Sequence, residues 1–223
     1  MRLVTVAHGT RHATGNEVAA RLTVAAGERL GVPAAVSYVE LCDPVLAVVL
    51  AASAEPAVVV PLLLTTGYHV TSDIPAAVAA APGPAVVTAP LGPDPLLAAA
   101  QVDRLLAAGA RRGQPAVLAA AGSTDPEALP RLEEATALLG EAWGGPVRLA
   151  TLGGLGPRLV DVVRPGDAVS PYLLSPGFFA SRCRDLARAS GATVVAEVIA
   201  VHDRVVELIE WRFVSAAGGA ARS

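Results

Sequence analysis

The stretch that decides the fold is Ala57–Pro75, AVVVPLLLTTGYHVTSDIP. It begins with a continuous apolar run, Ala57–Leu64, and a strand that is apolar at every position is typical of a parallel sheet covered on both faces. A turn follows, then His69, then a Thr-Ser-Asp sequence ahead of Pro75 that is typical of a helix start. The stretch therefore predicts strand, loop and helix, with the histidine at the carboxyl end of the strand, where open α/β sheets bind ligands.

The same alternation of strand and helix continues along the chain. Further strands are expected at Leu3–Ala7, Ala35–Val39, Ala85–Ala89, Ala116–Ala120, Val147–Leu152, Ala168–Leu174 and Thr193–Ile199. Helices are expected between them, and the last helix should run from His202 to about Phe213 and fray after Ala216. This pattern predicts an α/β fold of two similar units, each a four-stranded, mostly parallel sheet flanked by helices. A polar linker at Gly109–Gln114 would divide residues 1–110 from residues 115–215.

The two halves are an internal repeat. VAHGT at Val6–Thr10 matches AAAGS at Ala119–Ser123, and VVVPLLLTTGYH at Val58–His69 matches AVSPYLLSPGFF at Ala168–Phe179. In this alignment His8 falls on Ala121, His69 on Phe179, and Glu40 on or near Gly153. Three possible ligands are thus confined to the first half, which indicates one functional site retained by one repeat.

Composition narrows the class of protein. The sequence has 223 residues, 53% of them hydrophobic, but no apolar run is long enough to cross a bilayer and no signal peptide is recognisable. A net charge of −3 argues against nucleic acid as the main partner. Cys42 and Cys183 lie far apart without a CxxC motif, so we expect free thiols in a reducing compartment, the cytoplasm.

His8, Glu40 and His69 each follow a predicted strand, the first, second and third of the chain. If these strands are parallel neighbours, the three side chains converge at one edge of the sheet. Two imidazoles and a carboxylate suit a divalent first-row metal such as Fe, Co, Ni or Zn without selecting one. An imidazole at this edge is also able to accept protons near neutral pH.

Each residue also has a plainer interpretation. His8 alone would be a histidine bonded to backbone at the edge of the core, and Glu40 alone a solvated strand end. The His-Gly-Thr loop is also compatible with anion binding, because a glycine turn before a helix presents backbone N–H groups. We expect His12 and His202 to be exposed to solvent, and we leave Cys42 out of the ligand set.

Four segments together resemble the class II tetrapyrrole chelatases of the sirohydrochlorin type, which insert cobalt or ferrous iron into sirohydrochlorin and have a related nickel branch. The segments are VAHGTR at Val6–Arg11, YVELCDP at Tyr38–Pro44, VVVPLLLTTGYHVTSDIP at Val58–Pro75 and APLGPDPLL at Ala89–Leu97. The resemblance covers the first half directly and the second half only through the repeat. It implies two units facing each other across a cleft, fused in one chain that acts as a monomer.

The resemblance also implies roles for individual residues. The two metal-handling histidines of the family fall on His8 and His69, either of which would be the base for the macrocycle protons, and the assisting acidic residue falls on Glu40. The substrate carries many carboxylates, so arginines and backbone N–H groups near the cleft should bind it. The expected substrate-binding residues are Thr10, Arg11, Thr66, Gly67 and Arg182.

The function expected from these observations is a lyase for cobalamin or siroheme biosynthesis, a sirohydrochlorin cobaltochelatase or ferrochelatase. No cofactor is expected beyond the inserted metal, because the sequence has neither a histidine-rich tail nor a cysteine cluster. Two alternatives remain open. One is a metal or tetrapyrrole carrier with the same fold but no turnover. The other is a metal-dependent hydrolase in which the three ligands activate water.

Overall fold

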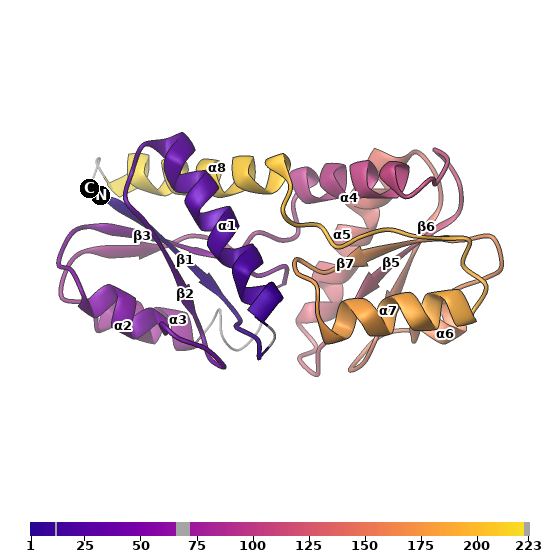
Figure 1. Ribbon diagram of the computed structural model, residues 1–223, viewed down its shortest axis with the longest axis horizontal. Helices are drawn as coiled ribbons and strands as arrows, with labels where there is room; N and C mark the ends of the chain where they lie inside the picture. Colours follow the sequence, from indigo (N-terminus) through magenta and orange to yellow (C-terminus); the bar gives the residue numbers. More distant parts are fainter. Residues whose placement is uncertain (12, 66–71, 221–223) are drawn as a thin grey trace. The chain divides into compact units, whose positions relative to one another are not determined.

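The computed structural model describes residues 1–11, 13–65 and 72–220 of the chain. They form an α/β protein with two parallel sheets, each in its own compact unit (Figure 1). The first unit comprises Met1–Leu91 and Asp203–Ser223, and the second comprises Gly92–His202. The predicted fold class, with two four-stranded parallel sheets flanked by helices, is confirmed.

The first unit is built on a parallel sheet of strand order β2-β1-β3-β4. Its strands are β1 (Arg2–Ala7), β2 (Ala34–Tyr38), β3 (Ala57–Pro61) and β4 (Ala85–Val87). One face carries α1 (Ala13–Leu30) and α8 (Asp203–Ala220), and the other carries α2 (Leu46–Ala51) and α3 (Ile74–Ala79) (Figure 1). With two covered faces, β3 is buried at all five positions, as its unbroken apolar sequence predicts.

The second unit repeats this plan with strand order β6-β5-β7-β8. Its strands are β5 (Ala116–Ala120), β6 (Val147–Thr151), β7 (Ala168–Tyr172) and β8 (Val194–Val195). Helices α4 (Pro95–Ala107) and α5 (Ala128–Trp143) pack together on one face, and α6 (Leu159–Val162) and α7 (Phe178–Ala189) on the other (Figure 1).

Strand register confirms the internal repeat residue by residue. Val6 of β1 lies opposite Pro61 of β3, and their counterparts Ala119 and Pro171 lie opposite each other in the second sheet. The same agreement holds on the other side of each central strand, where Ala7 pairs with Tyr38 and Ala120 pairs with Thr151. The carboxyl edges of the two sheets are therefore comparable position by position.

The division of the structure differs from the predicted division at residues 110–115. Helix α4 follows β4 in the chain but packs on α5 and β7 of the second unit, while α8 follows β8 and packs on α1 and β3 of the first. The two repeats have thus exchanged their last helices. The predicted linker, Gly109–Gln114, is a loop inside the second unit.

Polar contacts hold the exchanged helices in place. Arg29 of α1 donates a 2.7 Å hydrogen bond to Asp203 at the start of α8. In the second unit Arg104 of α4 donates to the carbonyl oxygens of Ile199 and Val201. This clamp brings His202 to 3.4 Å from Asp103 and leaves only 17% of its side chain exposed, so the prediction of a solvent-exposed His202 is wrong.

Several element boundaries also differ from the sequence-based expectation, and three of the differences have a clear cause. Strand β3 ends at Pro61 rather than Leu64, because its neighbour β1 ends at Ala7 and leaves the longer strand without a partner. Strand β8 comprises only Val194–Val195, the two residues that pair with β7, rather than Thr193–Ile199. Helix α8 continues to Ala220, beyond the expected fraying, since its apolar side packs on the first sheet.

Candidate metal centre

The loop that carries His8 is held against the loop that carries Glu40. His8 directly follows β1, and its carbonyl oxygen accepts a 3.2 Å hydrogen bond from the backbone N–H of Glu40. Gly9 makes this approach possible. A Cβ at that position would lie 1.9 Å from the carbonyl oxygen of Glu40, and the φ of +92° is one that side chains disfavour. The glycine therefore fixes the spacing of the two candidate ligands.

The side chains of His8 and Glu40 converge at the carboxyl edge of the first sheet. His8 Nε2 lies 3.8 Å from Glu40 Oε1, and each side chain is about half exposed, at 50% and 51%. Metal–ligand bonds of about 2.1 Å place two ligands of one tetrahedral ion about 3.4 Å apart, so a small movement would allow both groups to bind one ion. The structure thus brings together two of the three predicted ligands.

The third predicted ligand, His69, lies outside the described residues, as do Thr66, Gly67 and His12. Over residues 1–11, 13–65 and 72–220, no group of three His, Cys, Asp or Glu side chains is close enough to hold a metal ion. The first residue of the following helix is Ile74, and it is buried against the sheet.

Asn16 is a positioning residue that sequence reasoning missed. Its side chain accepts a 3.0 Å hydrogen bond from the backbone N–H of Thr10 and donates one of 2.7 Å to the carbonyl of Thr10. The sequence predicts Asn16 as a helix start, but α1 begins at Ala13, which places Asn16 in the first turn with its side chain directed at the loop. The sequence signal that could have indicated this contact is the side-chain amide of Asn16, six residues after Thr10 of the His-Gly-Thr motif.

These bonds correct the predicted role of the Thr10 amide. The sequence-based expectation was that this N–H would hold a substrate carboxylate, but it already donates to Asn16. Arg11 is exposed at the end of the same loop, in a position to meet an anion from solvent. Arg182 is exposed on α7 in the second unit.

Cys42 lies close to this site but does not join it. Burial is the largest influence on its thiol and raises the pKa above the ordinary value, while the backbone N–H of Thr10 lowers it and Asp43 raises it further. A raised pKa favours the protonated thiol, so metal binding by this sulfur would carry the added cost of removing its proton. Within the described part of the chain it forms no three-ligand group with His8 and Glu40.

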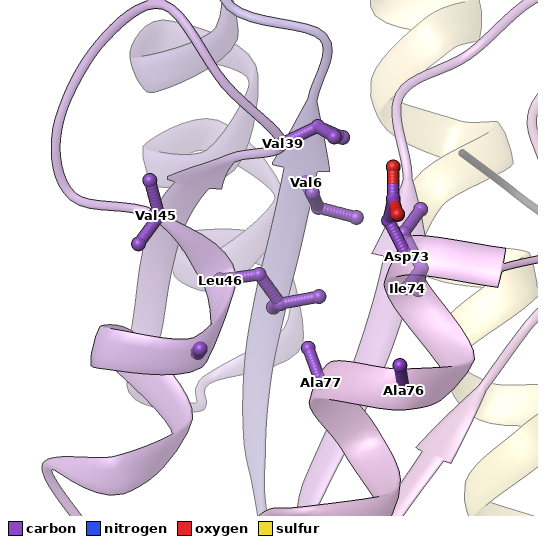
Figure 2. Close-up of a pocket in the computed structure, with 9 residues that line it drawn as sticks. Val6, Val39, Val45, Leu46, Asp73, Ile74, Ala76 and Ala77 are labelled. Atoms are coloured by element: carbon purple, nitrogen blue, oxygen red, sulfur yellow. The ribbon is translucent and has the colours of Figure 1, made fainter.

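A cavity of about 320 Å³ lies below this edge, between β1, α2 and α3 (Figure 2). Val6, Leu46 and Ala77 point into it, and Asp73 supplies its one charged lining side chain. An apolar hollow with a single carboxylate is unsuited to a macrocycle that carries many carboxylates. We therefore do not assign this cavity to the tetrapyrrole.

The second repeat has the same edge without the ligands. A Cβ at Gly122 would lie 1.8 Å from the carbonyl oxygen of Gly153, just as one at Gly9 would meet Glu40. This contact confirms that Gly153 occupies the position of Glu40, the weakest pairing of the sequence alignment. Ala121, directly before Gly122, then occupies the position of His8.

Comparisons with known proteins agree with this architecture. Residues 2–108, the first repeat with α4, match the model of the CbiX family. The comparison with curated protein sequences gave no match. Among the described helices, none has the length and apolar character to cross a membrane.

Solved structures extend the likeness to the whole chain. One is SirB from Bacillus subtilis with Fe3+, 23% identical, which covers 100% of this chain and 97% of its own at a TM-score of 0.79. A second is the sirohydrochlorin chelatase SirB from Bacillus subtilis subspecies spizizenii in complex with cobalt, which is 22% identical. The match covers 97% of this chain and 95% of that structure's chain, with a TM-score of 0.80. The third is DR2241 from Deinococcus radiodurans, a multi-domain protein similar to chelatases, 20% identical, covering 95% of this chain and 54% of its own at 0.72. At these identities the likeness establishes the fold of both repeats.

Proposed function

We propose that this chain, whose residues 2–108 match the model of the CbiX family, is a sirohydrochlorin chelatase that inserts Co2+ or Fe2+ into the macrocycle. The observation that carries the proposal is the convergence of His8 and Glu40 at the sheet edge, in the repeat that matches the family and not in the other. The match to SirB structures that contain Fe3+ and cobalt supports both metals equally.

In this proposal His8, Glu40 and His69 bind the incoming metal, which is a substrate of the reaction. As the metal enters the macrocycle, two pyrrole N–H protons must leave, and the imidazole of His8 or His69 accepts them. Glu40, 3.8 Å from His8, would stabilise the imidazolium that forms. Half exposure of both side chains allows the metal to arrive and the proton to leave. No resident cofactor is needed.

The proposal is tested by an anaerobic metallation assay. Sirohydrochlorin is mixed with Co2+ or Fe2+, and the absorption spectrum is followed with the wild-type protein and with His8→Ala, His69→Ala and Glu40→Gln variants. We expect many turnovers for the wild type and a loss of about 100-fold or more for each histidine variant, since a ligand and base are removed. His202→Gln, in the second unit, is the matched control and should retain activity.

The remaining alternatives are distinct outcomes of the same assay. Tight binding of the tetrapyrrole with no acceleration over the spontaneous rate would replace the chelatase by a carrier. Metal binding without any tetrapyrrole binding would favour a hydrolytic site. The faster of the two metals would indicate whether the product enters cobalamin or siroheme synthesis. We also propose that the two-repeat chain acts as a monomer, which light scattering during the assay would check.

A further inference from the structure

A cavity of about 540 Å³ opens at the amino-terminal edge of the second sheet. Pro115 directly precedes β5, Gly166 lies two residues before β7, and Thr193 directly precedes β8, and all three line the cavity. Because the strands are parallel, this edge is opposite to the carboxyl edge that corresponds to the metal centre of the first repeat. Every lining residue belongs to the second unit, so the cavity is a feature of that unit alone.

Two consecutive arginines supply the charge of this cavity. Arg111 and Arg112 are exposed in the loop between α4 and β5, where the backbone N–H of Gln114 donates a 2.9 Å hydrogen bond to the carbonyl of Arg111. Gly113 is the third residue of this four-residue turn and has a φ of +76°, as a type II turn requires. The predicted linker is therefore a tight turn that carries two guanidinium groups.

Hydrogen bonds fix the turn to the wall of the cavity. The side-chain oxygen of Gln114 accepts a 3.1 Å hydrogen bond from the backbone N–H of Arg111, and its side-chain nitrogen donates one of 2.8 Å to the carbonyl of Gly166. The guanidinium of Arg112 donates a 2.7 Å hydrogen bond to the carbonyl of Ala142 on α5. A loop that is held in this way loses little conformational freedom when a ligand binds.

Bonds within the second unit occupy acceptors of the lining and leave guanidinium donors available. The carbonyl of Gly166 accepts from Gln114 and also from the hydroxyl of Thr193, at 3.2 Å. The carbonyl of Gln114 accepts a 2.7 Å hydrogen bond from the indole of Trp143. The guanidinium of Arg111, by contrast, makes no hydrogen bond or ion pair with any described residue. A surface that offers donors with positive charge favours an anion over a cation.

No carboxylate neutralises the two arginines in the part of the chain that the structure describes. Asp167, which follows the lining residue Gly166, is only 4% exposed and is paired with Arg148. Glu141 is exposed near the end of α5, and it forms no ion pair with Arg111 or Arg112 among the described residues. Neighbouring guanidinium groups repel each other, and an anion that binds beside both relieves this repulsion.

We propose that this cavity binds a small multivalent oxyanion, a molecule that carries phosphate or carboxylate groups, through Arg111 and Arg112. The forked N–H donors of a guanidinium match both kinds of group. The cavity volume of about 540 Å³ lies within the range of small-molecule sites, about 300–1,000 Å³, and leaves room for more than one anionic group. The inference goes beyond the proposed function and does not depend on it.

The test is a calorimetric titration of metal-free protein at low ionic strength, with pyrophosphate and citrate as separate probes. We expect the Arg111→Gln/Arg112→Gln double variant to bind the preferred probe about tenfold more weakly than the wild type, because two charge-assisted contacts are lost. The same probe should raise the thermal unfolding midpoint of the wild type and not that of the variant. Both positions are exposed, so the variant should fold, which circular dichroism would verify.

Two further variants separate a built site from general charge. Arg131→Gln/Arg158→Gln removes the same two positive charges from exposed positions of the second unit outside the cavity lining, and it should leave the Kd unchanged. Arg111→Lys/Arg112→Lys keeps the charge without the forked donors and should give an intermediate Kd. Added salt should weaken binding to the wild type, as expected for exposed arginines.

The outcomes decide both the site and the kind of group that it recognises. Tighter binding of pyrophosphate than of citrate, lost in the glutamine variant at 111 and 112, would assign the cavity to ligands with phosphate groups, and the reverse order to ligands with carboxylate groups. The proposal is refuted if the wild type binds neither probe at millimolar concentration. It is also refuted if the control variant at 131 and 158 weakens binding as much as the variant at 111 and 112.

Discussion

The carboxyl edges of the two sheets share a backbone contact but differ in side chains: the first has His8 and Glu40 where the second has Ala121 and Gly153. In the first repeat Gly9 lets the His8 loop reach the Glu40 loop, and the two side chains meet at 3.8 Å. In the second, Gly122 makes the same approach to Gly153, but Ala121 and a glycine replace the ligands. The shared glycine contact therefore belongs to the fold of both repeats, and the repeats differ in whether candidate metal ligands lie beside it.

The largest expected effect comes from the shared glycine. Gly9→Ala should lower the free energy of unfolding by about 2–4 kcal/mol, because the new Cβ meets the Glu40 carbonyl at a positive φ. Gly122→Ala should cost a similar amount, but only Gly9→Ala should also impair Co2+ binding. Urea denaturation and metal titration at a temperature where both variants are folded would check this.

Gly31→Ala is the matched control for this pair. It also has a positive φ, +65°, but no atom lies within 4 Å of the added Cβ, so its cost should be near 1 kcal/mol. Equal loss of Co2+ affinity in the Gly9 and Gly122 variants would contradict the division between fold and chemistry.

A second effect should follow from Asn16, which ties Thr10 to α1 in the first repeat. Asn16→Ala removes two hydrogen bonds and should lower the free energy of unfolding by about 1–3 kcal/mol. Because the His8 loop loses its support, the metallation rate should also fall, even at temperatures where the variant is fully folded. Asn16→Asp keeps the acceptor for the Thr10 N–H and should recover part of the activity. A variant with full activity and lowered stability would limit Asn16 to a structural role.

Arg11 should have a smaller effect, on the substrate rather than the metal. Arg11→Ala should raise the Kd for sirohydrochlorin about fivefold, the size expected for one exposed charge pair, and leave Co2+ affinity unchanged. Arg21→Ala, at an exposed position on the following helix α1, is the control. Equal substrate affinity of the Arg11 variant and the wild type would remove this residue from the site.

The smallest expected effect is a gain of Co2+ binding by the second sheet, which tests directly whether the carboxyl edges of the two sheets are equivalent. Ala121→His with Gly153→Glu copies the His8–Glu40 pair onto the second sheet. Among the described residues, the one atom within 4 Å of a Cβ at Gly153 is the carbonyl oxygen of Ala121, at 3.9 Å, so the glutamate should be tolerated. In a His8→Ala background we expect a Co2+ site about one to two orders of magnitude weaker than the natural one, since only two side chains bind the ion. Absence of any new Co2+ absorption would show that the two edges are not interchangeable.

The sequence-based predictions were accurate for features set by local sequence patterns and missed features set by contacts between distant elements. β5 was predicted to the residue, and the strands of the first repeat were each located within a few residues, because fully buried strands are apolar at every position. The pairing of His8 with Glu40 followed from strand ends in a parallel sheet. The support from Asn16 and the burial of His202 were not predictable, because each depends on a contact made only after helices dock.

The sequence by itself determined the alternation of strands and helices, the internal repeat, and the residues placed at each strand end, because all three are encoded by local patterns of apolar residues and turns. Only the tertiary structure decided which unit each helix completes. Helices α4 and α8 follow equivalent strands, and each has an aspartate at its start, Asp94 as the N-cap of α4 and Asp203 as the first residue of α8, so the local sequence does not indicate which sheet either helix covers. Packing makes that choice: Leu97 and Leu105 of α4 are buried in the second unit and Val205 and Ile209 of α8 in the first. Burial of apolar surface is favourable wherever in the chain the buried residues lie, so an apolar helix face can complete either sheet.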